Sequence, residues 1–345
     1  MVDKNRICWI DVLKGLLLVL ICIGHFGNLP CWVAPIIHPT GMFYVPIFFM
    51  LSGYLLSVDG RTFQNFLHRK VQTLLIPYLF FSVVFIVLDW NTWLQPATYI
   101  QDNLYRFAVL GTGAIKASPL WFVIVLFVGD LFCFAVLRCT RHMEILLPII
   151  CVLSACAYAF CAYDVHLPWL FHLLPSVLIL MLSGYLLRSI QTKLKRIKHA
   201  DILMVIIVSG GVILANAYTL GDMHLNKISN YPLFYICPLS VGSGIIWFVR
   251  KTEKFCGEHV TYPLRWVATN GIVILACHVY IAIVFDAMWA KIGIGNDSLR
   301  FIAMFFVVFL TLCFVVVPVV NKYFYWFIGR KKSNGISSIN LKSTN

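Results

Sequence analysis

The sequence predicts an all-α fold: a polytopic membrane protein built as a bundle of about ten transmembrane helices. Of its 345 residues, 61% are hydrophobic and only 12% are charged, whereas a soluble chain carries about 25% charged residues. The apolar residues gather in runs of about 20, which is the length that crosses a bilayer as a helix. Most Lys and Arg residues lie between these runs.

The predicted helices follow one another along almost the whole chain. In order they are residues 7–27, 41–57, 73–90, 119–137, 145–162, 168–187, 200–219, 231–249, 267–290 and 299–320. The stretch from Asn91 to Ser118 is polar enough to lie outside the hydrocarbon, with a short interfacial helix around Leu104–Leu110. We expect residues 1–330 to form one membrane domain and residues 331–345 to form a polar cytoplasmic tail.

The basic residues predict the orientation of the bundle. If the N-terminus is cytoplasmic and the helices alternate in direction, 21 of the 27 Lys and Arg residues fall on the cytoplasmic side. Lys14 lies within a helix, and the few on the other side are Arg106, Lys116, Lys227, Lys291 and Arg300. Cytoplasmic loops carry this excess, so we expect both termini inside a multi-pass protein of the cell (inner or plasma) membrane. The net charge of +13 then reflects topology and does not indicate a nucleic-acid partner.

The cysteines indicate neither a metal site nor a disulfide framework. Most of the 12 lie inside apolar runs, and none forms a CxxC pair. Such cysteines are typical small apolar core residues, so no metal cofactor is predicted.

The first predicted helix carries charge where a membrane helix rarely does. Lys14 and His25 are 11 residues apart, which places them on one face and about 16 Å apart along the axis. Asp11 lies within about 40° of the same face. Ionisable residues inside a bilayer are costly and indicate functional sites. Two interpretations fit: an interfacial Asp11–Lys14 ion pair with His25 capping the helix, or a site in which Lys14 binds an anion and His25 acts as a base.

The run RICWIDVLKGLLLVLICIGH, from Arg6 to His25, resembles the opening motif of the acyltransferase family 3 membrane proteins. The motif is a basic residue, ten further residues and a His, here Lys14-x10-His25. Much of the family has Arg in place of Lys14. The Lys in this chain keeps the positive charge, but it cannot donate the two parallel hydrogen bonds that a guanidinium donates to one carboxylate or phosphate.

Further segments resemble the family in the same order along the chain. They are MFYVPIFFMLSGYLL (Met42–Leu56), FLHRKVQTLLIPYLFF (Phe66–Phe81), PLWFVIVLF (Pro119–Phe127) and TNGIVILACHVYIAI (Thr269–Ile283). Each is mostly apolar and weak alone, but the ordered set together with the first motif is specific. The resemblance covers nearly the whole chain.

The resemblance implies an integral-membrane enzyme that moves an acetyl or other acyl group from acetyl-CoA to a hydroxyl of a saccharide or glycolipid. It implies His25 as general base, with Lys14 and Asp11 as further candidate catalytic residues. Lys14, Arg69 and Lys70 would bind the phosphates of acetyl-CoA; ordinary positive-inside anchoring also explains Arg69 and Lys70. Direct transfer and a transient acetyl-His are both open.

Asp11 cannot orient His25, because 14 residues of helix separate them by about 21 Å. A carboxylate partner would come from another helix, with Asp130 and Asp286 as candidates. His278 fits a buried core histidine better than a catalytic one.

A second hypothesis is a multi-pass transporter or flippase for a saccharide or lipid-linked intermediate. Neither an inverted repeat nor a pair of matching broken helices supports it.

Overall fold

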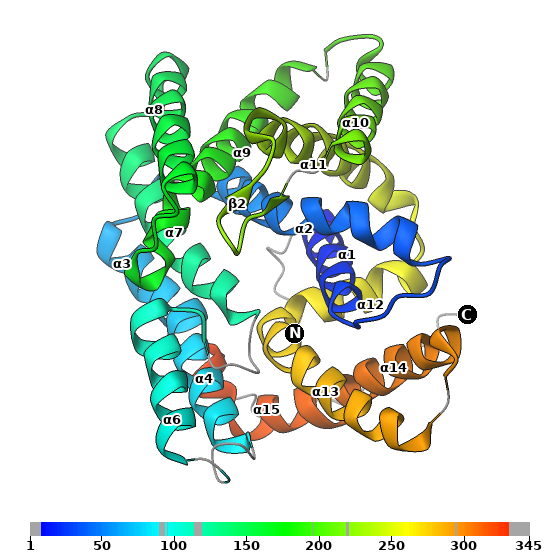
Figure 1. The fold of residues 1–345 in the computed structure, drawn as a ribbon. Helices are drawn as coiled ribbons and strands as arrows, with labels where there is room; N and C mark the ends of the chain where they lie inside the picture. Colours follow the sequence, from blue (N-terminus) through cyan, green and yellow to red (C-terminus); the bar gives the residue numbers. More distant parts are fainter. Residues whose placement is uncertain are drawn as a thin grey trace, which may run out of the picture.

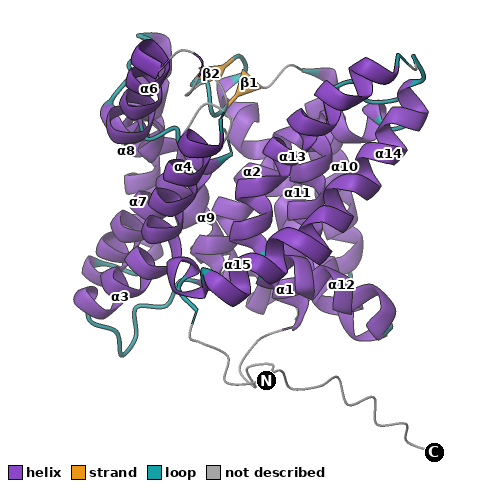
Figure 2. Ribbon diagram, turned by 90° about the horizontal axis from the view of Figure 1, so that it is seen from below, coloured by secondary structure: helices purple, strands orange, loops and turns teal. Residues whose placement is uncertain are grey.

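The computed structural model describes residues 8–89, 94, 96–113, 119–194, 196–218, 221–293 and 295–330. These residues are mainly helical (Figure 1). The longer helices run roughly side by side, and a short β-hairpin lies at one end of the bundle (Figure 2). The predicted all-α fold is confirmed.

Every predicted segment is helical over most of its described residues. Within the described residues, eight helices are long and apolar enough to cross a membrane: Phe63–Leu88, Leu120–Cys139, Met143–Ala162, Pro168–Leu194, Ala200–Ala217, Tyr231–Thr252, Gly271–Ile292 and Asp297–Tyr323. The two remaining predictions correspond to α1 (Cys8–Gly24) and α2 (Ala34–Leu55). The polar tail predicted over residues 331–345 lies outside the described residues.

The eight long spans comprise the following elements: α3 (Phe63–Lys70), η1 (Val71–Leu75) and α4 (Ile76–Leu88); α7 (Leu120–Cys139); α8 (Met143–Ala162); η4 (Pro168–Leu173) and α9 (Leu174–Leu194); α10 (Ala200–Ala217); α11 (Tyr231–Thr252); α13 (Gly271–Ile292); and α14 (Asp297–Thr311), η6 (Leu312–Val316) and α15 (Val317–Tyr323).

Shorter elements lie between the spans or after the last one. They are α6 (Pro96–Tyr105), η2 (Arg106–Leu110), the antiparallel strands β1 (Gly221–Asp222) and β2 (Lys227–Ile228), η5 (Glu253–Phe255), α12 (Glu258–Thr269) and η7 (Tyr325–Ile328). The helix predicted around Leu104–Leu110 is therefore present and begins earlier, at Pro96. Helix α12 was not predicted from the sequence, because it is too short and too polar to stand out as a membrane span.

Helix α1 lies at the centre, where α2, α11, α12 and α13 pack around it (Figure 1). Gly15 explains the close approach of α12, since a Cβ at this position would lie 2.0 Å from the carbonyl oxygen of Leu264. At the periphery, α8 and α10 expose apolar side chains such as Val152 and Ile206. Apolar side chains on the outside of a helical bundle are what a hydrocarbon environment favours.

The most extensive crossing joins α2 and α9. The two helices carry the same seven residues, MLSGYLL, at Met50–Leu56 and Met181–Leu187. A Cβ on Gly53 would lie 1.8 Å from the oxygen of Met181, and a Cβ on Gly184 would lie 1.9 Å from the oxygen of Met50. The copies thus cross reciprocally, each glycine against the other copy's backbone, in the manner of small-residue contacts between membrane helices.

Candidate functional site

His25 follows the last residue of α1, Gly24, and its side chain is exposed. Its Nδ1 lies 2.8 Å from the carbonyl oxygen of Ile21, one helical turn earlier. Only a protonated nitrogen can donate to a carbonyl, so the proton of neutral His25 sits on Nδ1. This leaves the lone pair on Nε2.

A second histidine supports the same tautomer. On α13, Nδ1 of the fully buried His278 lies 2.9 Å from the oxygen of Ile274, and its Nε2 lies 3.4 Å from Nδ1 of His25. Since His278 Nδ1 donates to a carbonyl, its Nε2 accepts from His25. The rings meet edge to face with centroids 5.1 Å apart. His278 is therefore the observed side-chain neighbour of His25, a position that the sequence analysis did not give it.

A cavity of about 510 Å³ lies one helical turn from these histidines, neither of which is among its lining residues. Ile21 and Leu275 line it, and these residues lie within one helical turn of His25 and His278 respectively. Four cationic side chains line the same cavity: Lys14, Arg61, Arg69 and Lys70. The structure thus brings together three predicted residues, Lys14, Arg69 and Lys70, and adds Arg61.

The backbone near the cavity departs from a regular α-helix. Residues Val71–Leu75 form a π-helical turn directly after Lys70, and two of them, Thr73 and Leu74, line the cavity. Pro77 lies two residues after this turn and cannot donate to the carbonyl of Thr73. Such bulges occur often at functional sites.

The carboxylate of Asp130 is fully buried, and it binds Lys70 and not His25. Its Oδ2 lies 2.5 Å from Nζ of Lys70, and its Oδ1 accepts a hydrogen bond of 2.7 Å from the hydroxyl of Ser52. A buried charge needs such partners. Asp130 therefore anchors one of the cavity's cations, Lys70, and the hydroxyl of Ser52 binds the second oxygen of the same carboxylate.

Asp286, the other candidate partner of His25, forms an ion pair with Arg300 of α14. Its Oδ1 lies 2.5 Å from Nη2 of Arg300, which also donates to the oxygen of Phe26 at 3.0 Å. Nη1 of Arg300 donates to the oxygen of Asn28 at 3.2 Å. The pair thus holds the loop that follows His25.

Asp11 is half-buried on α1, one turn before Lys14; its assignment as a catalytic residue stays a prediction. All of the cysteines are free. Among the residues that the structure describes, no group of His, Cys, Asp or Glu could hold a metal ion.

Two residues of the candidate site, Arg61 and His278, have no sequence pattern that would have identified them. Arg61 precedes α3 and looks like any basic loop residue, while His278 is separated from His25 by 253 positions. Their contributions depend on how the helices pack, and spacing within one helix carries no information about that.

Comparisons with known proteins identify the family of the chain. The model of the acyltransferase domain matches residues 7–320. Nodulation protein NolL of Mesorhizobium japonicum is 28% identical over 137 residues, covering 36% of this chain and 35% of that protein. NolL of Sinorhizobium fredii is 33% identical over 90 residues, covering 24% and 25%. The matches thus span about a third and a quarter of the relatives' own length.

No solved structure matches the chain. The family model nevertheless extends from the first residues of the Lys14–His25 motif to the last transmembrane helix. The chain therefore belongs to acyltransferase family 3, and it is a multi-pass membrane protein.

Proposed function

We propose that this enzyme transfers an acetyl group from acetyl-CoA to a hydroxyl of a saccharide or glycolipid, with His25 as the general base. One observation carries the proposal: a single cavity is lined by four cations and leads to the helical turns beside His25 and His278. The family favours this acyl transfer over the transporter or flippase hypothesis.

The cations suit the donor. The phosphates of acetyl-CoA carry several negative charges, and Lys and Arg are the side chains that bind phosphate best. Arg61 and Arg69 are exposed, whereas Lys14 and Lys70 are half-buried. This gradient suits a donor whose phosphates stay near the cavity's mouth while its thioester reaches inward. The predicted topology makes that mouth cytoplasmic, where acetyl-CoA is available.

The histidine pair suits the chemistry. Nε2 of His25 takes the proton of the acceptor hydroxyl as its oxygen attacks the thioester carbonyl carbon. The C–S bond then breaks, and the CoA thiolate recovers a proton from Nε2. The Nδ1–H of His25 stays bound to Ile21 and His278 throughout, so the ring is held while its charge changes. An acetyl-His25 intermediate would use the same lone pair and would give ping-pong kinetics.

The acceptor would bind at the opposite end of α1 from the donor's phosphates. His25 is exposed there, at the end that the basic residues predict to face away from the cytoplasm. We accordingly place the enzyme in the cell membrane, with an acceptor at the outer surface.

The test is transfer of labelled acetate from acetyl-CoA in isolated membranes. His25→Ala removes the base, so we expect transfer to fall by about 100-fold or more. His142→Ala, which removes an exposed histidine before α8, is the matched control and should transfer normally. Amounts of inserted protein are compared by immunoblot.

The acceptor is a glycan extract from cells that lack the protein, because its sites are unmodified. Undiminished transfer by His25→Ala at equal protein levels would rule out the general-base role. Solute uptake by the wild-type protein without acetyl transfer would instead support the transporter.

A further inference from the structure

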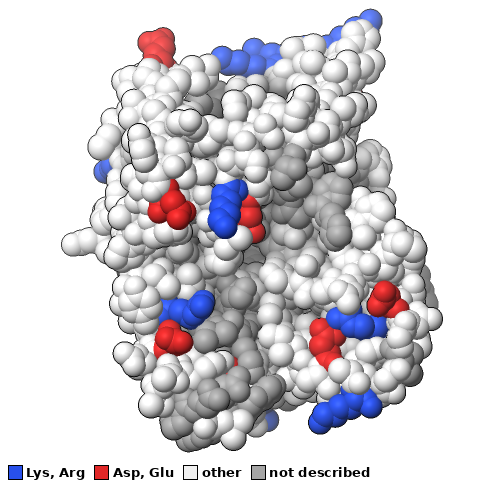
Figure 3. All heavy atoms as spheres, viewed as in Figure 1, with Lys and Arg blue, Asp and Glu red and all other residues white. Residues whose placement is uncertain are grey.

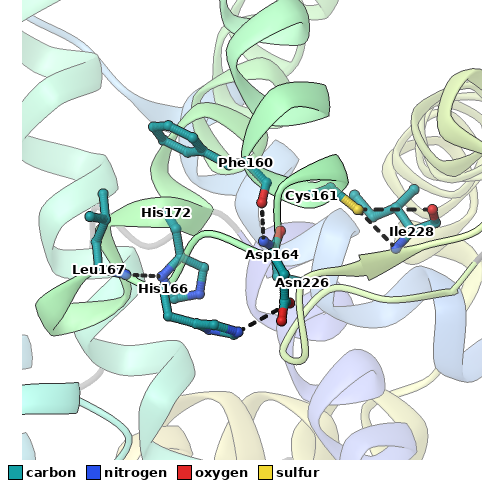
Figure 4. A network of polar contacts seen from close by, with 8 residues as sticks. All are labelled: Phe160, Cys161, Asp164, His166, Leu167, His172, Asn226 and Ile228. Atoms are coloured by element: carbon teal, nitrogen blue, oxygen red, sulfur yellow. Dashed lines mark hydrogen bonds and ion pairs between the residues drawn. The ribbon is translucent and has the colours of Figure 1, made fainter.

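Polar groups gather where the hairpin of β1 and β2, which follows the end of α10, meets the end of α8 (Figure 4). Nδ2 of Asn226 donates to the oxygen of Phe160 at 3.1 Å, and the backbone N–H of Ile228 donates to Sγ of Cys161 at 3.4 Å. Because these groups bind one another, the cluster serves to hold the hairpin on α8. A second polar cluster lies at the other end of α10, and its side chains surround a cavity.

This second cavity has a volume of about 750 Å³ and lies between the residues that begin α10 and the last turns of α11. Four cationic side chains line it: Arg196, Lys198, Arg250 and Lys251. One acid, Asp201, belongs to the same lining. The cavity therefore carries a net positive charge and favours an anionic ligand.

Neighbouring side chains hold two of these cations in place. Nη1 of Arg250 donates to the hydroxyl of Tyr54 at 3.1 Å. Nζ of Lys251 forms an ion pair with Oδ2 of Asp201, and Oδ1 of the same carboxylate accepts from Nε1 of Trp247 at 2.8 Å. The acid is thus paired within the protein, and part of the cavity is formed before any ligand binds.

The residue types indicate which anion the cavity suits. Positive-inside anchoring explains why basic residues lie at this end of the helices, but it does not explain why four of them line one cavity. Lys and Arg bind phosphate through strong charge-assisted hydrogen bonds. A phosphate group is therefore the ligand that the lining fits best.

The surface next to the cavity favours a lipid as the source of that phosphate. Val205 lies one helical turn after Asp201 on the same face of α10, and 51% of its surface is exposed. Ile202 and Ile206 beside it are 59% and 63% exposed. Since α10 is one of the membrane spans, these side chains suit contact with hydrocarbon. The cationic cavity thus lies at the end of an apolar surface that acyl chains can cover.

We propose that this cavity binds the phosphate of an anionic phospholipid, whose acyl chains lie along α10. The predicted topology places the cavity on the cytoplasmic side, where the negative surface of the membrane attracts basic clusters. The inference goes beyond the proposed acetyl transfer and does not depend on it, because it concerns a separate cavity with its own cations.

Native mass spectrometry of the purified protein in detergent counts the bound lipids. Phosphatidylglycerol is compared with phosphatidylcholine of the same acyl chains, and inorganic phosphate is added as the free anion. The test variant is Arg196→Gln/Lys198→Gln, since both side chains are exposed and their removal leaves the contacts of the other two cations intact. Lys193→Gln/Lys322→Gln is the matched control, because it removes the same charge from exposed positions outside the lining.

We expect the wild-type protein to bind phosphatidylglycerol with a lower Kd than phosphatidylcholine. The test variant should bind phosphatidylglycerol about 30-fold more weakly, because each Lys or Arg near an anionic surface strengthens the attraction about five-fold. The control variant should keep the wild-type Kd.

Three results would overturn the inference. The first is an unchanged Kd for phosphatidylglycerol in the test variant. The second is an equal loss of affinity in the control variant, which would show a general effect of surface charge. The third is displacement of phosphatidylglycerol by an equal concentration of inorganic phosphate, which would assign the cavity to a free phosphate and not to a lipid.

Discussion

At the scale of single residues, two acceptors hold the proton of neutral His25 on Nδ1. One is the carbonyl of Ile21, which any histidine four residues further along a helix can reach. The other is Nε2 of His278. The spacing of Lys14 and His25 predicts that they share one face of α1, because positions within a single helix follow simple geometry. His278 could not be assigned as the neighbour of His25, since the contact depends on how α1 and α13 pack.

His278 should therefore act as a positioning residue. His278→Leu removes the acceptor from Nδ1 of His25, and we expect kcat to fall about ten-fold or more while the KM for acetyl-CoA stays constant. His278→Gln places a carbonyl oxygen near the position of Nε2 and should recover part of that loss. The comparison is made by acetyl transfer at equal amounts of inserted protein. Equal activity of the two variants would show that His278 only fills space.

At the scale of elements, apolar length located the ten helices, because the bilayer imposes the same requirement on every span. The crossings between helices were not predictable in this way. The contact of Gly53 with Met181 and that of Gly184 with Met50 join segments far apart in sequence. Helix α12 was missed because a short amphipathic helix that packs on α1 need not be apolar along its length.

The glycine crossing predicts which substitutions the bundle will not tolerate. Gly53→Ala places a Cβ against backbone that cannot move aside, so we expect a loss of about 1–3 kcal/mol in stability. Gly210→Ala is the control, because a Cβ there meets nothing within 4 Å; it should be neutral or stabilise α10 slightly. Thermal unfolding of the purified protein in detergent measures both. If the Gly53→Ala protein proves as stable as the Gly210→Ala protein, α2 and α9 must lie further apart than the contact of Gly53 with Met181 requires.

At the scale of the whole molecule, the predicted topology still needs a direct measurement. The face bearing the hairpin shows only scattered basic and acidic side chains among its described residues (Figure 3). The cysteines offer natural reporters, because Cys31, Cys139 and Cys256 are exposed near helix ends.

In intact cells, a membrane-impermeant maleimide should label a variant that retains Cys31 alone. Variants that retain Cys139 alone or Cys256 alone should be labelled only after the membrane is permeabilised. Mass shift on gels detects the reaction. Labelling of Cys139 in intact cells would reverse the orientation, and with it the side on which each substrate enters.

The repeated heptapeptide shows how one short sequence can acquire two roles. Ser52, in the first copy, donates to Asp130 beside the cavity, and Tyr54 meets Gln191 and Arg250. In the second copy, Tyr185 lines a different hollow, together with Arg141 and Arg188. The two copies make equivalent backbone contacts with each other, but their side chains have different neighbours. A search for MLSGYLL in related chains would therefore find helix crossings, and only the copy that faces an aspartate would mark the cavity with cationic lining.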